Sequence, residues 1–180
     1  MKTTFFLLFF VSFNFFGNAQ TKDDWNNLTT GQWAFDVNPS LFILNHRLEY
    51  FLTKDDNKRI SIPELLEKEN VIVENNSYKE IKYGENQYLI TRRKDKGNLR
   101  MFKVLKESDN LYVLCSENRD ICDCKANTFL YFKSESKLQR IEKAFSFSLK
   151  QNLLDRLTEN KIIYKPNKED LSFCEILKNL

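Results

Sequence analysis

The sequence predicts an α+β fold that is predominantly antiparallel β, in which the strands form either a meander or an eight-stranded barrel and are followed by C-terminal helices. Short apolar runs alternate with polar turns between about residues 32 and 133. Apolar residues then recur every three or four positions between about residues 135 and 180. No internal repeat or low-complexity linker interrupts the chain, so residues 20–180 are expected to form one globular domain.

Residues 1–19 have the pattern of a cleaved secretory signal peptide. Lys2 supplies a positive charge, an apolar run follows over residues 5–16, and the small residues Gly17 and Ala19 precede the expected cleavage point. The run is shorter than the roughly 20 residues that a membrane-spanning helix needs. We therefore expect a secreted or periplasmic protein that begins at Gln20 and has no transmembrane segment in its mature chain.

Two strands separated by a turn are predicted at the start of the mature chain. They cover residues 32–37 and 41–53, with the turn at Asn38-Pro39-Ser40. A helix is predicted from Ser61 to about residue 69, because Ser61-Ile62-Pro63-Glu64 has the pattern of a capping box. Residues 71–74 resume an extended pattern.

A meander is predicted in the centre of the chain, where apolar segments are joined by short polar turns typical of antiparallel hairpins. Its strands cover residues 78–83, 87–94, 99–106, 111–116 and 128–133. Several of these strands are apolar on both faces, so both faces of the sheet are expected to be covered.

Helical spacing begins after residue 134. The apolar positions at this spacing are Leu138, Ile141, Phe145, Leu149, Leu153 and Leu157. Phe145, Phe147 and Leu149 also alternate, which would instead fit a last strand. A terminal helix is predicted to open at Pro166-Asn167 and to carry Cys174 on its apolar stripe.

The four cysteines, Cys115, Cys122, Cys124 and Cys174, are predicted to form structural disulfides. Export favours disulfides, and the spacing fits neither the C-x-x-C redox motif nor the usual zinc spacers. A bond between Cys122 and Cys124 would close a strained ring. Cys174 is therefore expected to bond Cys122 or Cys124, with Cys115 bonded to the other; free thiols and a metal are the alternatives.

The composition argues against several functional classes. The chain has a net charge of +3, and its basic clusters at residues 58–59 and 92–94 are interleaved with aspartates, so no nucleic-acid partner is expected. His46 is the only histidine and stands outside any catalytic signature. The few glycines form no phosphate-binding loop, and no cofactor or metal is expected. A hydrolase with an unrecognised carboxylate pair is an alternative that sequence leaves open.

The segment Gly31-Gln32-Trp33 resembles the G-x-W motif in the first strand of lipocalin-like proteins. The resemblance implies a closed eight-stranded antiparallel barrel with an outer C-terminal helix and an internal cavity for a small apolar molecule. In that family a basic side chain after the last strand often covers the tryptophan, and Arg140 is the nearest arginine in this position. The candidate lining residues, chosen by strand position, are Trp33, Phe35, Tyr88, Phe102 and Tyr131.

Together these patterns predict an exported, non-enzymatic binding protein whose partner is a small apolar ligand, as for a lipocalin-like carrier. The alternative is a protein–protein interaction module, such as an inhibitor, an immunity-type partner or an envelope assembly factor. In that case the disulfide loop would be a rigid contact element for an unidentified protein.

Overall fold

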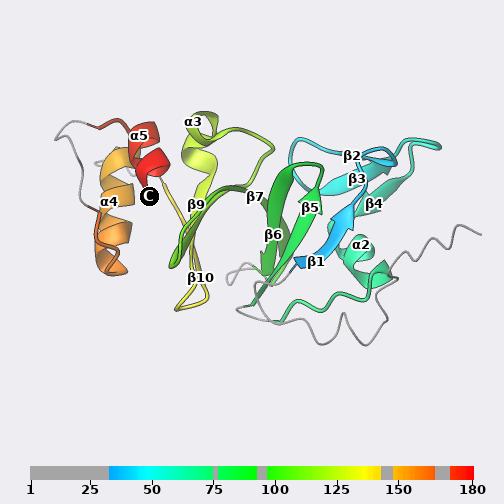
Figure 1. Cartoon of the computed structure of the whole chain (residues 1–180), viewed down its shortest axis with the longest axis horizontal. Helices are drawn as coiled ribbons and strands as arrows, with labels where there is room; N and C mark the ends of the chain where they lie inside the picture. Colours follow the sequence, from blue (N-terminus) through cyan, green and yellow to red (C-terminus); the bar gives the residue numbers. More distant parts are fainter. Residues whose placement is uncertain (1–32, 75–76, 93–96, 143–147, 165–170) are drawn as a thin grey trace, which may run out of the picture.

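A computed structural model of the chain describes residues 33–74, 77–92, 97–142, 148–164 and 171–180, with side chains from Asp36 onward. Ten strands form two sheets (Figure 1). Across the large sheet the strands lie in the order β1 (Trp33–Val37), β5 (Tyr78–Tyr83), β6 (Asn86–Arg92), β7 (Leu99–Glu107), β8 (Leu111–Cys115), β9 (Thr128–Phe132) and β10 (Lys137–Arg140). The small sheet contains β2 (Phe42–Leu44), β3 (Tyr50–Thr53) and β4 (Arg59–Ser61).

The described residues contain four helices. They are α2 (Ile62–Lys68), α3 (Ile121–Cys124) with the adjoining 3-10 turn η1 (Lys125–Asn127), α4 (Leu149–Glu159) and α5 (Phe173–Asn179). Helices and mostly antiparallel strands together make an α+β fold, as predicted. Among the described residues no helix is long and apolar enough to cross a membrane.

The large sheet is open, so the meander alternative is confirmed and the eight-stranded barrel is not formed. Strands β5 to β10 each pair antiparallel with the next, whereas β1 adds to the edge at β5 in parallel. No pairing among the described strands joins β1 to β10. The barrel prediction fails because residues 42–61, which would supply its early strands, form a separate sheet.

The predicted strand over residues 41–53 is interrupted by a tight loop. The Asn45 side-chain oxygen accepts hydrogen bonds from the backbone amides of Glu49 at 2.7 Å and Tyr50 at 3.0 Å. Leu48 has a positive φ of 55°, which turns the chain back on itself. These contacts divide the segment into the hairpin β2–β3 and leave residues 45–49 projecting as its loop.

Helix α2 forms where the sequence predicts it. The Ser61 side-chain oxygen accepts a hydrogen bond from the backbone amide of Glu64 at 3.3 Å, while the Glu64 carboxylate pairs with Lys68 at 3.4 Å. Leu65 and Leu66 are buried beneath the helix. Ser61 therefore caps the helix as expected. The Glu64 side chain, which the capping-box pattern directs back to Ser61, pairs with Lys68 on the exposed side of the helix.

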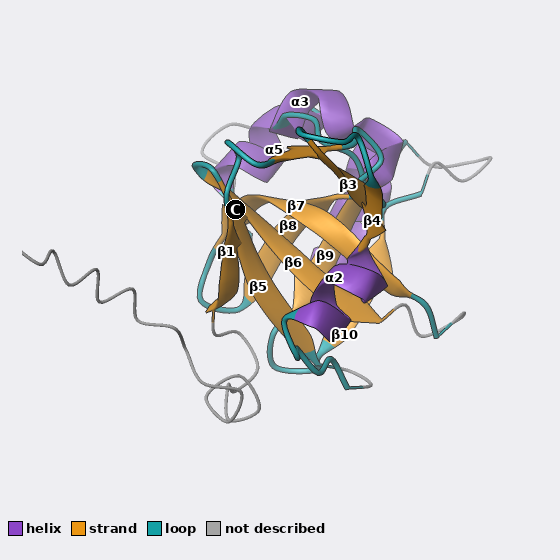
Figure 2. Cartoon of the chain, turned by 90° about the vertical axis from the view of Figure 1, so that its right-hand side faces the viewer, coloured by secondary structure: helices purple, strands orange, loops and turns teal. Residues whose placement is uncertain are grey.

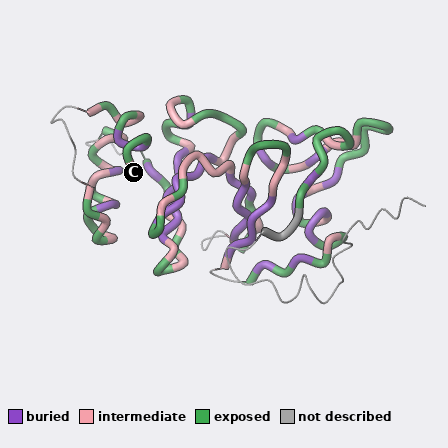
Figure 3. The backbone as a smooth tube through the Cα atoms, viewed as in Figure 1, coloured by how far each residue is buried: buried purple, intermediate pink, exposed green. Residues whose placement is uncertain are grey.

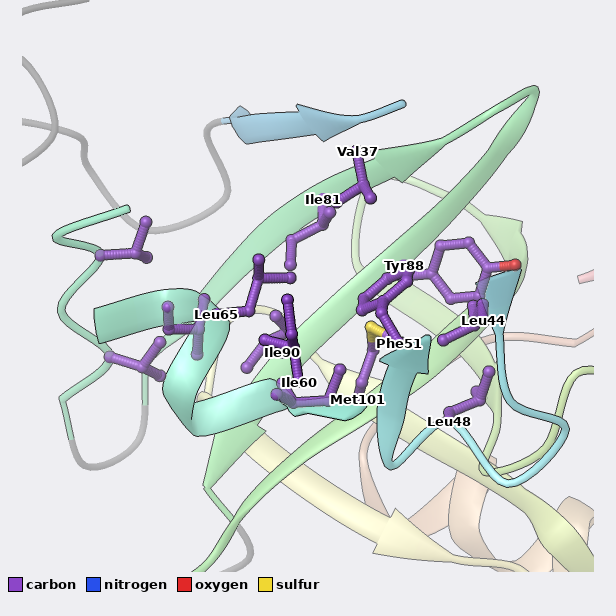
Figure 4. Packing of buried hydrophobic residues seen from close by; sticks show 14 residues of the cluster. Val37, Leu44, Leu48, Phe51, Ile60, Leu65, Ile81, Tyr88, Ile90 and Met101 are labelled. Carbon is purple, nitrogen blue, oxygen red and sulfur yellow. The ribbon is translucent and has the colours of Figure 1, made fainter. Parts of the chain in front are cut away.

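One face of the large sheet is covered by two separate layers. The small sheet and α2 cover β5 to β7, and α4 and α5 cover β8 and β9 (Figures 1 and 3). Phe51 of β3 packs among buried residues of the first layer, which include Ile81, Tyr88 and Met101 of the large sheet (Figure 4). We call this face the covered face.

The strands of the large sheet twist across the molecule (Figure 2). The opposite face packs around a third cluster of buried residues and is called the concave face. Its cluster contains Tyr78, Leu89, Phe102, Tyr112, Leu114, Phe129 and Tyr131. The rings of Tyr78 on β5 and Tyr131 on β9 are 4.9 Å apart, although three strands lie between them in the sheet. In a flat sheet these strands would be about 19 Å apart, because neighbouring strands are spaced by about 4.8 Å.

The C-terminal region differs from its prediction in two places. Residues 137–140, expected to begin a helix, form strand β10, which follows β9 through a turn in which Ser136 has a φ of 48°. Leu138 packs against the concave cluster, whereas Ile141 lies among the residues beneath α4 and α5. The three-residue spacing of Leu138 and Ile141 therefore does not mark one face of a helix. Phe145 and Phe147 lie outside the described residues.

Helix α5 begins later than predicted. Ser172 and Glu175 form its capping box, with the Glu175 carboxylate accepting from the Ser172 amide at 2.8 Å. The expected start at Pro166 and Asn167 lies outside the described residues.

Two disulfides link the middle and the end of the chain, as predicted. Cys115 is bonded to Cys124, with Cα atoms 5.8 Å apart, and Cys122 is bonded to Cys174, with Cα atoms 5.0 Å apart. The first bond closes a short loop after β8, and the second fastens α5 to α3. Of the two pairings that the sequence left open, this is the one in which Cys174 bonds Cys122.

Candidate functional site

A hollow of about 160 Å³ opens at one end of the concave face, and we call it the arginine pocket. It is lined by Arg47, Arg100, Met101, Phe102, Ser116, Phe129 and Arg140. These residues come from the β2–β3 loop, from β7, β9 and β10, and from the position that follows β8. The pocket therefore depends on the curl of the sheet and on the loop of the small sheet.

Two aromatic rings form the apolar part of the pocket. Phe102 and Phe129 are 2% and 6% exposed, and their ring centroids are 5.0 Å apart with the planes tilted by 59°. Both belong to the concave cluster, so the packing of that cluster holds them in place. They offer a rigid apolar surface to anything that enters the pocket.

Three arginines line the same hollow as these rings, with little neutralising charge beside them. Arg140 donates from Nε to the carbonyl of Ala126 at 3.2 Å, and its guanidinium lies 5.9 Å from the Phe129 ring centroid. Arg100 lies 3.9 Å from the Glu49 carboxylate. Arg47 makes no ion pair with another described residue. Guanidinium groups bind carboxylates and phosphates through paired hydrogen bonds, so the pocket is suited to an anion.

The structure places the five predicted lining residues in different environments. Phe102 lines the arginine pocket, and Tyr131 lies in the same concave cluster. Tyr88 belongs to the covered face, where burial raises the pKa of its hydroxyl to about 12 and the hydroxyl lies 3.4 Å from the Asn118 side-chain oxygen. For Trp33 and Phe35 the structure describes the backbone in β1 but not the side chains.

Sequence reasoning missed Arg47 and Arg100. Arg100 and Phe102 are two positions apart on β7, so they point to the same face of the sheet. A basic residue beside Phe102 on this face is the one local signal of the pocket. Arg47 reaches the pocket only because residues 45–49 form a loop. Arg140 was named through the family resemblance, and it lies beside Phe129. The side chain of Trp33, which it was expected to cover, lies outside the described side chains.

A buried carboxylate lies elsewhere on the concave face, where it accepts a hydrogen bond from the Tyr112 hydroxyl. This residue, Glu80, is 7% exposed. Near it, Glu107 pairs with Lys133 at 2.7 Å, and the Lys133 ammonium lies 4.2 Å from the Tyr112 ring centroid. Two carboxylates thus come close in space, but Lys133 and the packed tyrosine rings occupy the surroundings. We interpret this cluster as structural.

Burial raises the pKa of Glu80, the hydrogen bond from Tyr112 partly opposes this effect, and the charge of Glu107 adds to it. The folded protein then keeps the Glu80 proton to a higher pH than the unfolded chain. Stability should therefore fall as pH rises from the unfolded value near 4.5 through the folded pKa.

Replacing Glu80 with Gln is expected to remove the pH dependence of stability that Glu80 causes. The amide still accepts the hydrogen bond from Tyr112 but does not titrate. The variant should gain stability relative to the unmodified protein as pH rises through that window. Urea unfolding at a series of pH values measures it, with Glu85→Gln in the exposed β5–β6 turn as the control. Parallel pH profiles for E80Q and the unmodified protein would contradict the assignment.

Other hollows lie elsewhere on the described part of the surface. An apolar groove of about 460 Å³ runs between α2 and residues 70–73, where Ile72 is 60% exposed. A polar hollow of about 430 Å³ lies on the disulfide loop and is lined by Asn118, Arg119, Asp120, Asp123 and Lys125. Within the described ranges, no group of three or more His, Cys, Asp or Glu side chains is placed to hold a metal ion.

A scan against models of known protein families found no match, and searches of curated proteins and of solved structures likewise found no similar chain.

Proposed function

We propose that this is an exported, non-enzymatic binding protein that holds a small amphipathic anion in the arginine pocket. The observation that carries the proposal is the convergence of Arg47, Arg100 and Arg140 on a hollow with two phenylalanine rings. The guanidinium groups bind the anionic head, and the rings contact the apolar part. The proposal keeps the small ligand expected of a lipocalin-like carrier and adds a charged group to it.

The volume of the pocket restricts the size of the ligand. About 160 Å³ corresponds to roughly five water molecules at about 30 Å³ each. Sites for drug-sized ligands are larger, at roughly 300–1,000 Å³. A short-chain or single-ring carboxylate fits these limits, and benzoate combines a planar anion with one aromatic ring.

Export is part of the proposal and has two supports. The signal-peptide pattern in residues 1–19 directs the chain out of the cytoplasm. All four cysteines are paired, which is typical of proteins in oxidising compartments.

Arg100→Gln and Arg140→Gln are each expected to weaken benzoate binding roughly tenfold or more, the effect of losing one hydrogen bond to a charged group. Isothermal titration calorimetry with benzoate measures the affinity. Arg156→Gln is the matched control, because Arg156 is an arginine of α4 that pairs with Glu159 and does not line the pocket. Failure of the unmodified protein to bind benzoate at millimolar concentration, or equal affinity in all variants, would overturn the proposal.

A second candidate function is protein–protein recognition through the disulfide loop. The polar hollow at Asn118–Lys125 lies on a segment held by two disulfides, which gives a contact surface that loses little conformational entropy on binding. Cross-linking of the exported protein to a partner through Lys125, in a protein that does not bind benzoate, would favour this function.

A further inference from the structure

We infer that the disulfide loop, residues 116–127, is the positioning element of the arginine pocket, so that ligand affinity depends on the Cys115–Cys124 bond. The inference rests on the proposed function. It assigns control of the ligand affinity to a segment that lies mostly outside the pocket. It follows from three separate contacts between this loop and the residues that line the pocket.

The first two contacts involve the ends of the loop. Ser116, the first residue of the loop, lines the pocket itself. Near the other end, the carbonyl of Ala126 accepts the hydrogen bond from Arg140 Nε at 3.2 Å. This bond fixes one edge of the Arg140 guanidinium and directs its remaining N–H groups. A displaced loop would therefore move a pocket wall and release an arginine at the same time.

The third contact reaches Arg47 through its neighbour. The backbone amide of Asn118 donates to the carbonyl of His46 at 2.8 Å, which ties the disulfide loop to the β2–β3 loop. Side chains meet at the same link, since the Glu117 carboxylate lies 3.5 Å from His46 Nε2 and forms an ion pair with Arg119. Neither Glu117 nor Arg119 lines the arginine pocket. Glu117 is therefore a positioning residue that acts through the loop carrying Arg47.

The Cys115–Cys124 bond determines the path of this loop. Cys115 immediately precedes Ser116, and Cys124 lies two positions before Ala126. Closing this span brings the two pocket contacts to fixed places beside β8 and β9. The Cys122–Cys174 bond, in contrast, joins α3 to α5 on the side of the C-terminal helices. Both bonds hold the disulfide loop, because Cys122 lies within it. The Cys115–Cys124 bond is the one nearer to Ser116 and Ala126, and it is therefore the one expected to control the pocket.

The first test compares the two disulfides by benzoate titration on the full mature chain, at a temperature where each variant is folded by circular dichroism. Cys115→Ser/Cys124→Ser should lower the affinity for benzoate by more than tenfold, whereas Cys122→Ser/Cys174→Ser should leave it within about twofold. Equal affinities in the two double variants would overturn the inference.

The second test is independent of the disulfides and applies even where a cysteine variant does not fold. Glu117→Ala is expected to weaken benzoate binding roughly threefold to tenfold, as for mutations that act through a neighbouring network. Because Glu117 acts through Arg47, the same change should have no further effect in an Arg47→Ala background. In an Arg140→Gln background, whose described contacts are to Ala126 and Phe129 rather than to the β2–β3 loop, it should keep its full effect. Glu107→Ala, which breaks the Lys133 pair near Glu80, is the control.

The outcomes separate this inference from the proposed function. Benzoate binding that depends on Arg100 but not on Glu117 or on the Cys115–Cys124 bond would refute the positioning role and leave the pocket assigned. Additive effects of E117A and R47A would also refute it, because they would show that Glu117 acts elsewhere. Absence of benzoate binding in the unmodified protein would overturn both.

Discussion

Replacing Cys122 and Cys174 together with serine is expected to lower the free energy of unfolding by about 4 kcal/mol, because their bond closes a span of 52 residues. The bond restricts the unfolded chain, and the entropy restored on its removal grows with the length of the closed loop. The variant should also show faster amide exchange in α5, whose buried residues Ile176 and Leu177 lose their covalent tether. Urea unfolding and hydrogen exchange measure the two effects.

The second disulfide provides the matched comparison. Cys115 and Cys124 are separated by nine positions, so their replacement should lower the free energy of unfolding by about 2.5 kcal/mol and leave exchange in α5 unchanged. A larger loss for the short loop than for the long one would contradict the chain-entropy argument. Four free thiols in freshly exported protein would contradict both assignments.

Replacing Phe51 with Ala is expected to destabilise the protein by about 3–5 kcal/mol, the cost of deleting a buried aromatic ring. Phe51 is fully buried between the small sheet and the large sheet (Figure 4). The centroid of its ring lies 6.1 Å from that of Phe42 and 5.5 Å from that of Tyr83. The cavity left behind would remove the main aromatic contact between the two sheets. Thermal and urea unfolding measure the loss.

Ile43→Ala is the control for this prediction. Ile43 lies in the same small sheet but is 45% exposed, so its truncation should change stability by about 0.5 kcal/mol or less. Similar losses for F51A and I43A would show that the small sheet does not pack on the large sheet through Phe51.

The strands and α2 were predictable because their signals are local. The apolar strands from Tyr78 to Phe132 alternate with short polar turns, and Ser61 caps α2 within three residues. Strand β10 was not predictable, because Leu138 and Ile141 have helical spacing while pairing with β9 determines their actual conformation. The parallel addition of β1 to β5 depends on residues far apart in sequence and leaves no local pattern.

The candidate site was less accessible to sequence reasoning than the fold. Arg47, Arg100 and Arg140 belong to three separate segments, and the curl of the large sheet together with the β2–β3 loop brings them to one hollow. Phe102 was selected for its strand position, and the same reasoning selected Tyr88, which lies on the covered face. A strand pattern that is apolar on both faces gives no information about which face is concave.

The order of the strands has a consequence for how the chain assembles as it folds. Strands β5 to β10 pair with their neighbours along the chain, so this part of the sheet can form progressively from short hairpins. Strand β1 precedes β5 in the chain but has no partner in the sheet until β5 is available, since Trp33 pairs with Glu80. Cys174 follows all the described strands, and Cys122 lies between β8 and β9. We therefore expect the Cys122–Cys174 bond to close on a sheet whose hairpins have already formed and to secure helix α5 against it.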